Sequence, residues 1–208
     1  MTQRLGFLAL VLTVSLLPAT AQAAPILFDL EGEAPAVGLT TLALTSGGMT
    51  MTITREGGAT FGVQQPISFP PEFGSRVLSP FLGTAGSFAF LANLSQPTYF
   101  FGLDFGDLID DDDFVTLQAF SGPNQTGTLL ASQTFPYPGK AFPSFESISI
   151  GGPNPALSLR FFSDAIVPNT VYFDNIRLDT APAVPEPASL LLLASGLAGV
   201  AFSRRRRR

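Results

Sequence analysis

The 208-residue sequence contains no cysteine, no histidine and no tryptophan, and only 13% of its residues are charged. Without cysteine and histidine there is no thiol nucleophile, no Ser-His-Asp relay, no thiolate or imidazole zinc site and no disulfide. The charged fraction is about half of the roughly 25% that is typical of soluble domains. Carboxylates, hydroxyls, other oxygen ligands and aromatic rings are therefore the groups left for binding or catalysis.

Much of the hydrophobicity lies at the two chain ends. At the N-terminus, Arg4 precedes an apolar run from Leu5 to Leu17, and small residues follow at 19–23. This order predicts a secretory signal peptide over residues 1–23, with cleavage after Ala23. An uncleaved anchor is the alternative, but the run is shorter than the roughly 20 apolar residues that span a bilayer.

The C-terminal end, residues 183–208, carries a second membrane signal. Pro185-Glu186-Pro187 leads into an uncharged stretch from Ala188 to Phe202, and Arg204 to Arg208 close the chain. As a helix, this stretch would be ~22 Å long, which predicts a short transmembrane helix. The arginines would stay cytoplasmic and leave the preceding domain outside. Attachment to nucleic acid is the alternative for an arginine tail, but its contact with an apolar run in an exported chain disfavours it.

The Pro-Glu-Pro motif, the short apolar helix and the terminal arginines together resemble a PEP-CTERM sorting segment. This resemblance implies processing by an exosortase, with Pro185, Glu186 and Pro187 as the recognition motif. It also implies a Gram-negative bacterium that makes exopolysaccharide. The protein would then be anchored in the inner membrane during sorting and later reach the cell surface or extracellular matrix.

The domain between the two signals is acidic. Arg4 and Arg204 to Arg208 are six of the eleven basic residues, so residues 24–184 keep five basic against fifteen acidic groups. A net charge near −10 repels nucleic acid and anionic lipid. It suits cation binding or solubility, and no nucleic-acid partner is expected.

Residues 24–182 show the pattern of short strands separated by Gly, Pro, Asn and Asp. Residues 49–54, Met-Thr-Met-Thr-Ile-Thr, alternate apolar and polar side chains as a strand with one wet face does. We expect an all-β fold, an antiparallel β-sandwich of jelly-roll type with most phenylalanines in its core. The expected strands are 26–31, 39–44, 49–55, 59–63, 76–79, 87–92, 98–105, 114–121, 128–135, 145–150, 157–162 and 170–178.

The first and last expected strands carry paired acidic residues. Phe28-Asp29-Leu30-Glu31 opens the domain, and a Phe173-Asp174-Asn175 segment lies in its final strand. This pairing resembles the ends of jelly-roll carbohydrate-binding modules, which can share a structural calcium. The resemblance implies Asp29 or Glu31 and Asp174 as ligands, with carbonyls completing a shell of about six to eight oxygens. The alternative is that Asp174 and Asn175 only make hydrogen bonds at a strand end.

A second acidic cluster comprises Asp104, Asp107 and Asp110 to Asp113. It lacks the EF-hand spacing and the distal glutamate. Two interpretations remain, a calcium site or an exposed, hydrated turn that keeps sheet edges from pairing, and the second is favoured.

Two proline-stiffened aromatic loops could contact a sugar. One spans residues 135–143 and contains Tyr137, Lys140 and Phe142, and the other spans residues 69–73. Sugars pack their C–H faces on aromatic rings while their hydroxyls bind polar groups, so Tyr137, Lys140 and Phe142 are candidate glycan-binding residues. The alternative is that these rings only cap one end of the sandwich.

These observations favour an exported, non-catalytic protein that binds a glycan of the extracellular polysaccharide, with calcium as its only expected cofactor. A structural matrix protein without a discrete ligand is the first alternative. The second is a carboxylate-based glycoside hydrolase, for which Glu56, Glu72 and Glu146 are candidates by composition only. No catalytic residue is assigned.

Overall fold

The computed structural model describes residues 24–65, 74–80, 88–107, 112–137, 144–164 and 171–181. All of them lie within one compact unit, Ala23–Ala183. The strands are β1 (Ile26–Phe28), β2 (Ala36–Leu39), β3 (Thr41–Ser46), β4 (Met49–Arg55), β5 (Phe61–Gln64), β6 (Val77–Ser79), β7 (Phe88–Asp107), β8 (Asp113–Phe120), β9 (Leu129–Tyr137), β10 (Ser144–Ser163) and β11 (Val171–Asp179). Two short 3-10 turns, η1 (Glu56–Gly58) and η3 (Pro123–Gln125), accompany them.

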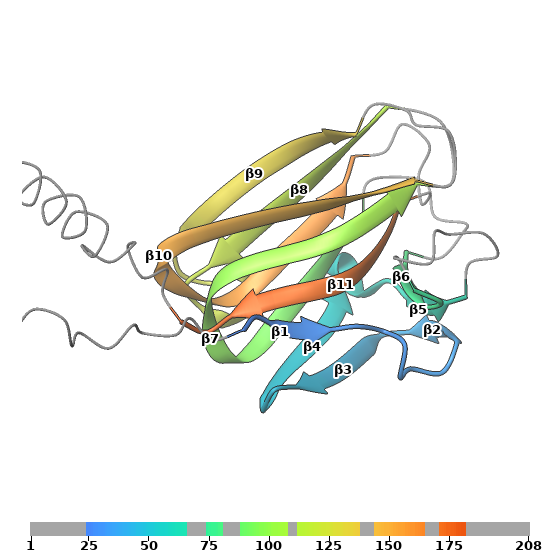
Figure 1. Cartoon of the computed structure of the whole chain (residues 1–208), viewed down its shortest axis with the longest axis horizontal. Helices are drawn as coiled ribbons and strands as arrows, with labels where there is room; N and C mark the ends of the chain where they lie inside the picture. The colour runs from blue at the N-terminus through green and yellow to red at the C-terminus, as the bar shows by residue number, and fades with distance from the viewer. Residues whose placement is uncertain are drawn as a thin grey trace, which may run out of the picture. The chain divides into compact units, whose positions relative to one another are not determined.

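All strand pairs are antiparallel, and the long strands β7 and β10 connect two layers (Figure 1). The first half of β7 pairs with β4, and the second half of β10 pairs with β8. The second half of β7 instead pairs with β11 on one side and with the first half of β10 on the other. One layer is therefore β3-β4-β7-β10-β8-β9, and the other is β2-β5-β6-β11-β7-β10 with β1 also paired to β11. The expected antiparallel all-β sandwich is confirmed.

Two pairs of expected strands are single strands in the structure. The expected strands 87–92 and 98–105 are both parts of β7, and 145–150 and 157–162 are both parts of β10. The Gly-Gly-Pro sequence at 151–153 produces a register shift within β10 and not an end of the strand. Glycine and proline therefore mark where the strands bend from one layer into the other.

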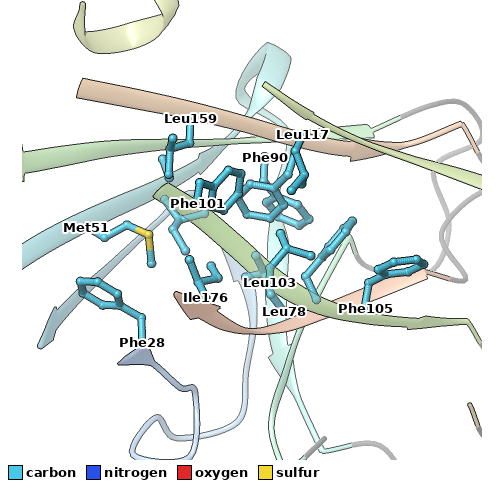
Figure 2. Close-up of a cluster of buried hydrophobic side chains, with 14 of the residues drawn as sticks. Phe28, Met51, Leu78, Phe90, Phe101, Leu103, Phe105, Leu117, Leu159 and Ile176 are labelled. Atoms are coloured by element: carbon cyan, nitrogen blue, oxygen red, sulfur yellow. The ribbon is translucent and has the colours of Figure 1, made fainter. Parts of the chain in front are cut away.

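Phenylalanine rings fill the space between the layers. Eight of the described phenylalanines are buried: Phe28, Phe61, Phe88, Phe90, Phe101, Phe105, Phe161 and Phe173. Phe90 stacks on Phe161 at 5.4 Å between ring centroids, and Phe173 meets Phe161 edge-on at 5.1 Å. Figure 2 shows part of this cluster, with residues from β1, β4, β6, β7, β8, β10 and β11. Because the rings come from both layers, they hold the two layers together.

Strand β11 has two different neighbours along one edge. The three residues of β1 pair with 176–178, and β6 pairs at Phe173. The register of β11 against β7 shifts between Asp174 and Arg177, and Asn175 has a φ of 48°. Asp174 therefore lies at a bulge of β11, between the part that pairs with β1 and the part that pairs with β6. Asp29 and Glu31 follow β1 closely in the sequence.

No helix in the described ranges is long and apolar enough to span a membrane. The expected signal peptide at 1–23, the Pro-Glu-Pro motif and the expected helix from Ala188 to Phe202 lie outside the described residues.

Candidate metal centre

Asp174 is buried at the bulge of β11, and only 1% of its surface is exposed. Within the described part of the chain, neither carboxylate oxygen makes a hydrogen bond of good geometry. Burial raises the pKa of Asp174 to about 7, and the negative charges of Glu31 and Asp29 add to the rise. The backbone N–H groups of Asn175 and Leu30 offset only part of it. A bare carboxylate in this position is costly, so the site favours a proton or a cation.

Glu31 lies beside Asp174 and is held by the chain segment before β6. Its Oε1 accepts hydrogen bonds from the backbone N–H groups of Ser75 at 2.5 Å and Arg76 at 3.0 Å, and its Oε2 accepts one from Ser75 Oγ at 2.6 Å. Burial alone would raise the pKa of Glu31, but these hydrogen bonds lower it below its ordinary value. Glu31 is therefore a fixed, ionised carboxylate next to Asp174.

Gly74 lets the two carboxylates approach the same point. A Cβ built on Gly74 would collide with Oε1 of Glu31 and would lie 3.4 Å from Oδ2 of Asp174. Gly74 also has a φ of 81°, a left-handed conformation that glycine adopts without strain. The segment from Gly74 to Arg76 thus closes the site from the side of β6, which the sequence alone did not indicate.

The structure places two of the three predicted metal ligands, Asp174 and Glu31, next to each other, whereas the third, Asp29, has a different role. Asp174 is buried and Glu31 is anchored, whereas Asp29 is exposed and acts on Asp174 through its charge. No group of three or more carboxylates among the described residues is arranged to hold a metal by side chains alone. A hard cation such as calcium would therefore need backbone carbonyl or water oxygens beside Asp174 and Glu31.

The second acidic cluster differs from the favoured expectation of an exposed turn. Asp104, Asp107 and Asp113 are buried in strands, whereas Asp112 is exposed and Asp110 and Asp111 lie outside the described residues. Oδ1 of Asp104 lies 2.5 Å from Nη2 of Arg177 and accepts a hydrogen bond from Ser147 Oγ at 2.6 Å. The exposed-turn interpretation is wrong for these three residues, because they lie within β7 and β8 and are buried.

Tyr137 does not present its ring to a sugar. It ends β9 with 1% of its surface exposed, and its ring lies 5.1 Å from that of Phe105. The assignment of Tyr137 as a glycan-binding residue is therefore corrected, since a core ring has no free face. Lys140 and Phe142 lie outside the described residues, as does the loop at 69–73.

Glu56 and Glu146, two of the glutamates considered for hydrolysis, lie on different elements. Glu56 lies in η1 and forms an exposed ion pair with Arg160, with 2.9 Å between Oε2 and Nη2. Glu146 lies in the first half of β10, opposite Phe105 of β7, and Glu72 is outside the described ranges. Nothing in these positions identifies an acid and base pair.

One part of the chain matches a known family model. Residues 183–208 match the PEP-CTERM protein-sorting motif. The expected sorting segment is confirmed over the same residues, and the PEP-CTERM motif indicates an exported protein that is sorted through the membrane and processed by an exosortase. No curated protein sequence matches the chain.

Solved structures with a similar fold include carbohydrate-binding modules. TmCBM61 in complex with β-1,4-galactotriose is 13% identical, covers 63% of this chain and 88% of its own, and has a TM-score of 0.41. The family 11 carbohydrate-binding module of Clostridium thermocellum, in complex with a mixed-linked tetrasaccharide, is 12% identical, covers 77% and 98%, and has a TM-score of 0.37. A GH29 fucosidase of Ruminococcus gnavus is 10% identical with a TM-score of 0.39, and the match covers 65% of this chain but only 26% of the fucosidase. Such low similarity assigns no function to this chain.

Proposed function

We propose that the protein is an exported, non-catalytic module of jelly-roll type that binds extracellular polysaccharide, with a calcium ion linking its first and last strands. The PEP-CTERM match supports its route, through an exosortase to the surface or matrix of a Gram-negative bacterium. Asp174 and Glu31 support the calcium, because a cation between them would neutralise a buried carboxylate whose hydrogen bonds offset only part of the cost of burial.

The observation that carries glycan binding is the chemistry of the outward strand faces. These faces present hydroxyl groups on both layers, and the side chains are exposed or half-buried: Thr41, Thr45, Thr50, Thr52, Thr54, Ser132, Thr134, Ser147 and Ser149. Uncharged donors and acceptors of this kind can hydrogen-bond the hydroxyls of a polysaccharide without the cost of desolvating charges.

Affinity electrophoresis of the full chain in mild detergent, through gels that contain soluble polysaccharides, tests this function. We expect retardation by at least one polysaccharide and no release of reducing sugar. Absence of retardation by every neutral and acidic polysaccharide would favour the structural matrix protein. Release of reducing sugar that is lost in Glu56→Gln or Glu146→Gln would favour the hydrolase.

A further inference from the structure

The outward face of the strip formed by β10, β7 and β11 combines a ring with uncharged and paired polar groups. On β7, Phe101, Leu103 and Phe105 point into the core, so Phe100, Gly102 and Asp104 point to the other face. The register places Gly151, Ser149 and Ser147 of β10 beside these three residues, and Arg177 of β11 beside Gly102. Figure 1 shows these three strands running next to one another.

The Phe100 ring lies over the backbone of Gly102 and close to that of Gly151. A Cβ at Gly102 would lie 3.2 Å from Cε1 and Cζ of this ring, and a Cβ at Gly151 would lie 3.8 Å from its Cδ2. The ring is half-buried, and the two glycines have no side chain that could cover its outer side. It therefore offers an aromatic surface fixed in place before any ligand binds.

Polar groups continue the strip beyond the ring. Arg177 and Asp104 form an ion pair whose side chains are 29% and 6% exposed, and Ser147 donates to the same carboxylate oxygen. Ser147 and Ser149 are exposed. The charge of Arg177 is matched by Asp104, and Asp179 of β11, which pairs with Phe100, adds a buried carboxylate at that end of the strip.

We propose that this strip, Phe100 with Arg177, Asp104, Ser147 and Ser149, binds a neutral polysaccharide chain. A sugar ring would place its C–H face on Phe100, and its hydroxyls would meet the serines and the ion pair. The net charge near −10 of residues 24–184 repels an acidic polysaccharide, so the strip selects a neutral one. This assignment rests on the proposed glycan-binding function and gives that function its site.

The opposite layer provides a matched control. Its outward face also carries a phenylalanine with an arginine and carboxylate pair, but the Arg160 guanidinium lies 4.1 Å from the centroid of the Phe162 ring. The guanidinium covers that ring, whereas the Phe100 ring lies over Gly102 and close to Gly151, which have no side chains. Phe162 is therefore an aromatic residue of similar burial that is unsuited to stacking on a sugar.

The experiment compares binding of galactan, mixed-linkage β-glucan and galactomannan, with alginate as the acidic probe, by the full chain in mild detergent. We expect Phe100→Ala to weaken binding of the preferred neutral polysaccharide at least about tenfold, and Phe162→Ala to change it by no more than about twofold. Phe100→Tyr should keep the affinity, because it keeps the ring.

A second pair of variants covers the case in which Phe100→Ala does not fold. Ser149→Glu adds a charged side chain at an exposed position of the strip without removing a core contact, and Gln133→Glu adds a charge at an exposed position on β9 of the other layer. Only Ser149→Glu should reduce binding. If the protein binds a neutral polysaccharide but Phe100→Ala and Ser149→Glu bind it like wild type, the strip is not the binding site, and the glycan-binding function stands. Binding of alginate alone overturns the neutral ligand, and binding of no polysaccharide overturns the function itself.

Discussion

Asp104 and Asp174 are paired across β7 and β11, yet their carboxylates meet different partners. Asp104 is neutralised by Arg177 and hydrogen-bonded by Ser147, whereas Asp174 lacks a good hydrogen bond among the described residues. The bulge after Asp174 explains the difference, because it moves Arg177 to the row of Gly102, from where it reaches Asp104. Two aspartates in the same row of the sheet therefore have different partners because of one register shift.

Asp174 should make stability depend on pH in the absence of a cation. Its pKa is raised from 3.8 to about 7 in the folded protein, so between these values the unfolded chain releases the proton that the folded protein keeps. In EDTA, the free energy of unfolding should fall as pH rises through this window, by at most ~1.4 kcal/mol per pH unit. Calcium should reverse the loss, with a larger rise of Tm at pH 8 than at pH 5, since it binds the ionised form.

Asp174→Asn tests this directly in thermal melts of the full chain. The neutral side chain should remove both the pH slope and the calcium response while leaving the protein in EDTA at pH 8 at least as stable as wild type. Asp164→Asn, at an exposed position, is the control and should keep both effects. Identical melts of wild type with EDTA and with calcium at pH 8 would overturn the calcium site.

At the scale of elements, the short strand β1 matters because of where it ends. Its three residues pair with β11, and Phe28 points into the core with 2% of its surface exposed. This pairing positions the residues that follow β1, Asp29 and Glu31, near the bulge of β11. A strand of three residues depends on side-chain burial for its stability, since it has few hydrogen bonds.

Truncation of Phe28 should therefore affect both stability and the metal site. Phe28→Ala should lower the free energy of unfolding by about 3 to 5 kcal/mol and reduce the calcium-dependent rise of Tm. Leu27→Ala on the same strand removes a side chain that is 43% exposed and should cost less than about 1 kcal/mol without changing the calcium response. Equal effects of the two variants in denaturant unfolding would show that β1 is not anchored by its core face.

The strands illustrate what local pattern can predict. Alternation in 49–55 gave β4 with its observed bounds, because one face of β4 lies on the core and the other faces solvent. The same reasoning wrongly predicted two strands in place of β7 and two in place of β10. Glycine and proline inside a long strand look the same in the sequence as the residues that end a strand. The burial of Tyr137 was missed because a proline-rich loop sequence follows it directly, and no local signal shows that its ring reaches Phe105.

For the whole molecule, the sorting segment at residues 183–208 should control processing and release from the membrane. Replacing Pro185, Glu186 and Pro187 by alanine should abolish exosortase processing and leave the longer, membrane-retained form in immunoblots of a bacterium that has an exosortase. Ser189→Ala, next to the motif, should be processed normally. Release of the triple variant at the rate of wild type would contradict the role of the motif.

The sequence by itself determined the C-terminal sorting segment, the acidic and cysteine-free chemistry and the all-β class, and it predicted an acidic site at the first and last strands. These properties depend on composition, on short motifs and on alternation along the chain, which are local. The tertiary structure decided which aspartate is left unsatisfied, that Gly74 and Ser75 close the site, that Tyr137 is buried and that Phe100 lies on glycines beside Arg177. These properties depend on strand order, register and a single bulge, because pairing between distant strands sets which side chains become neighbours.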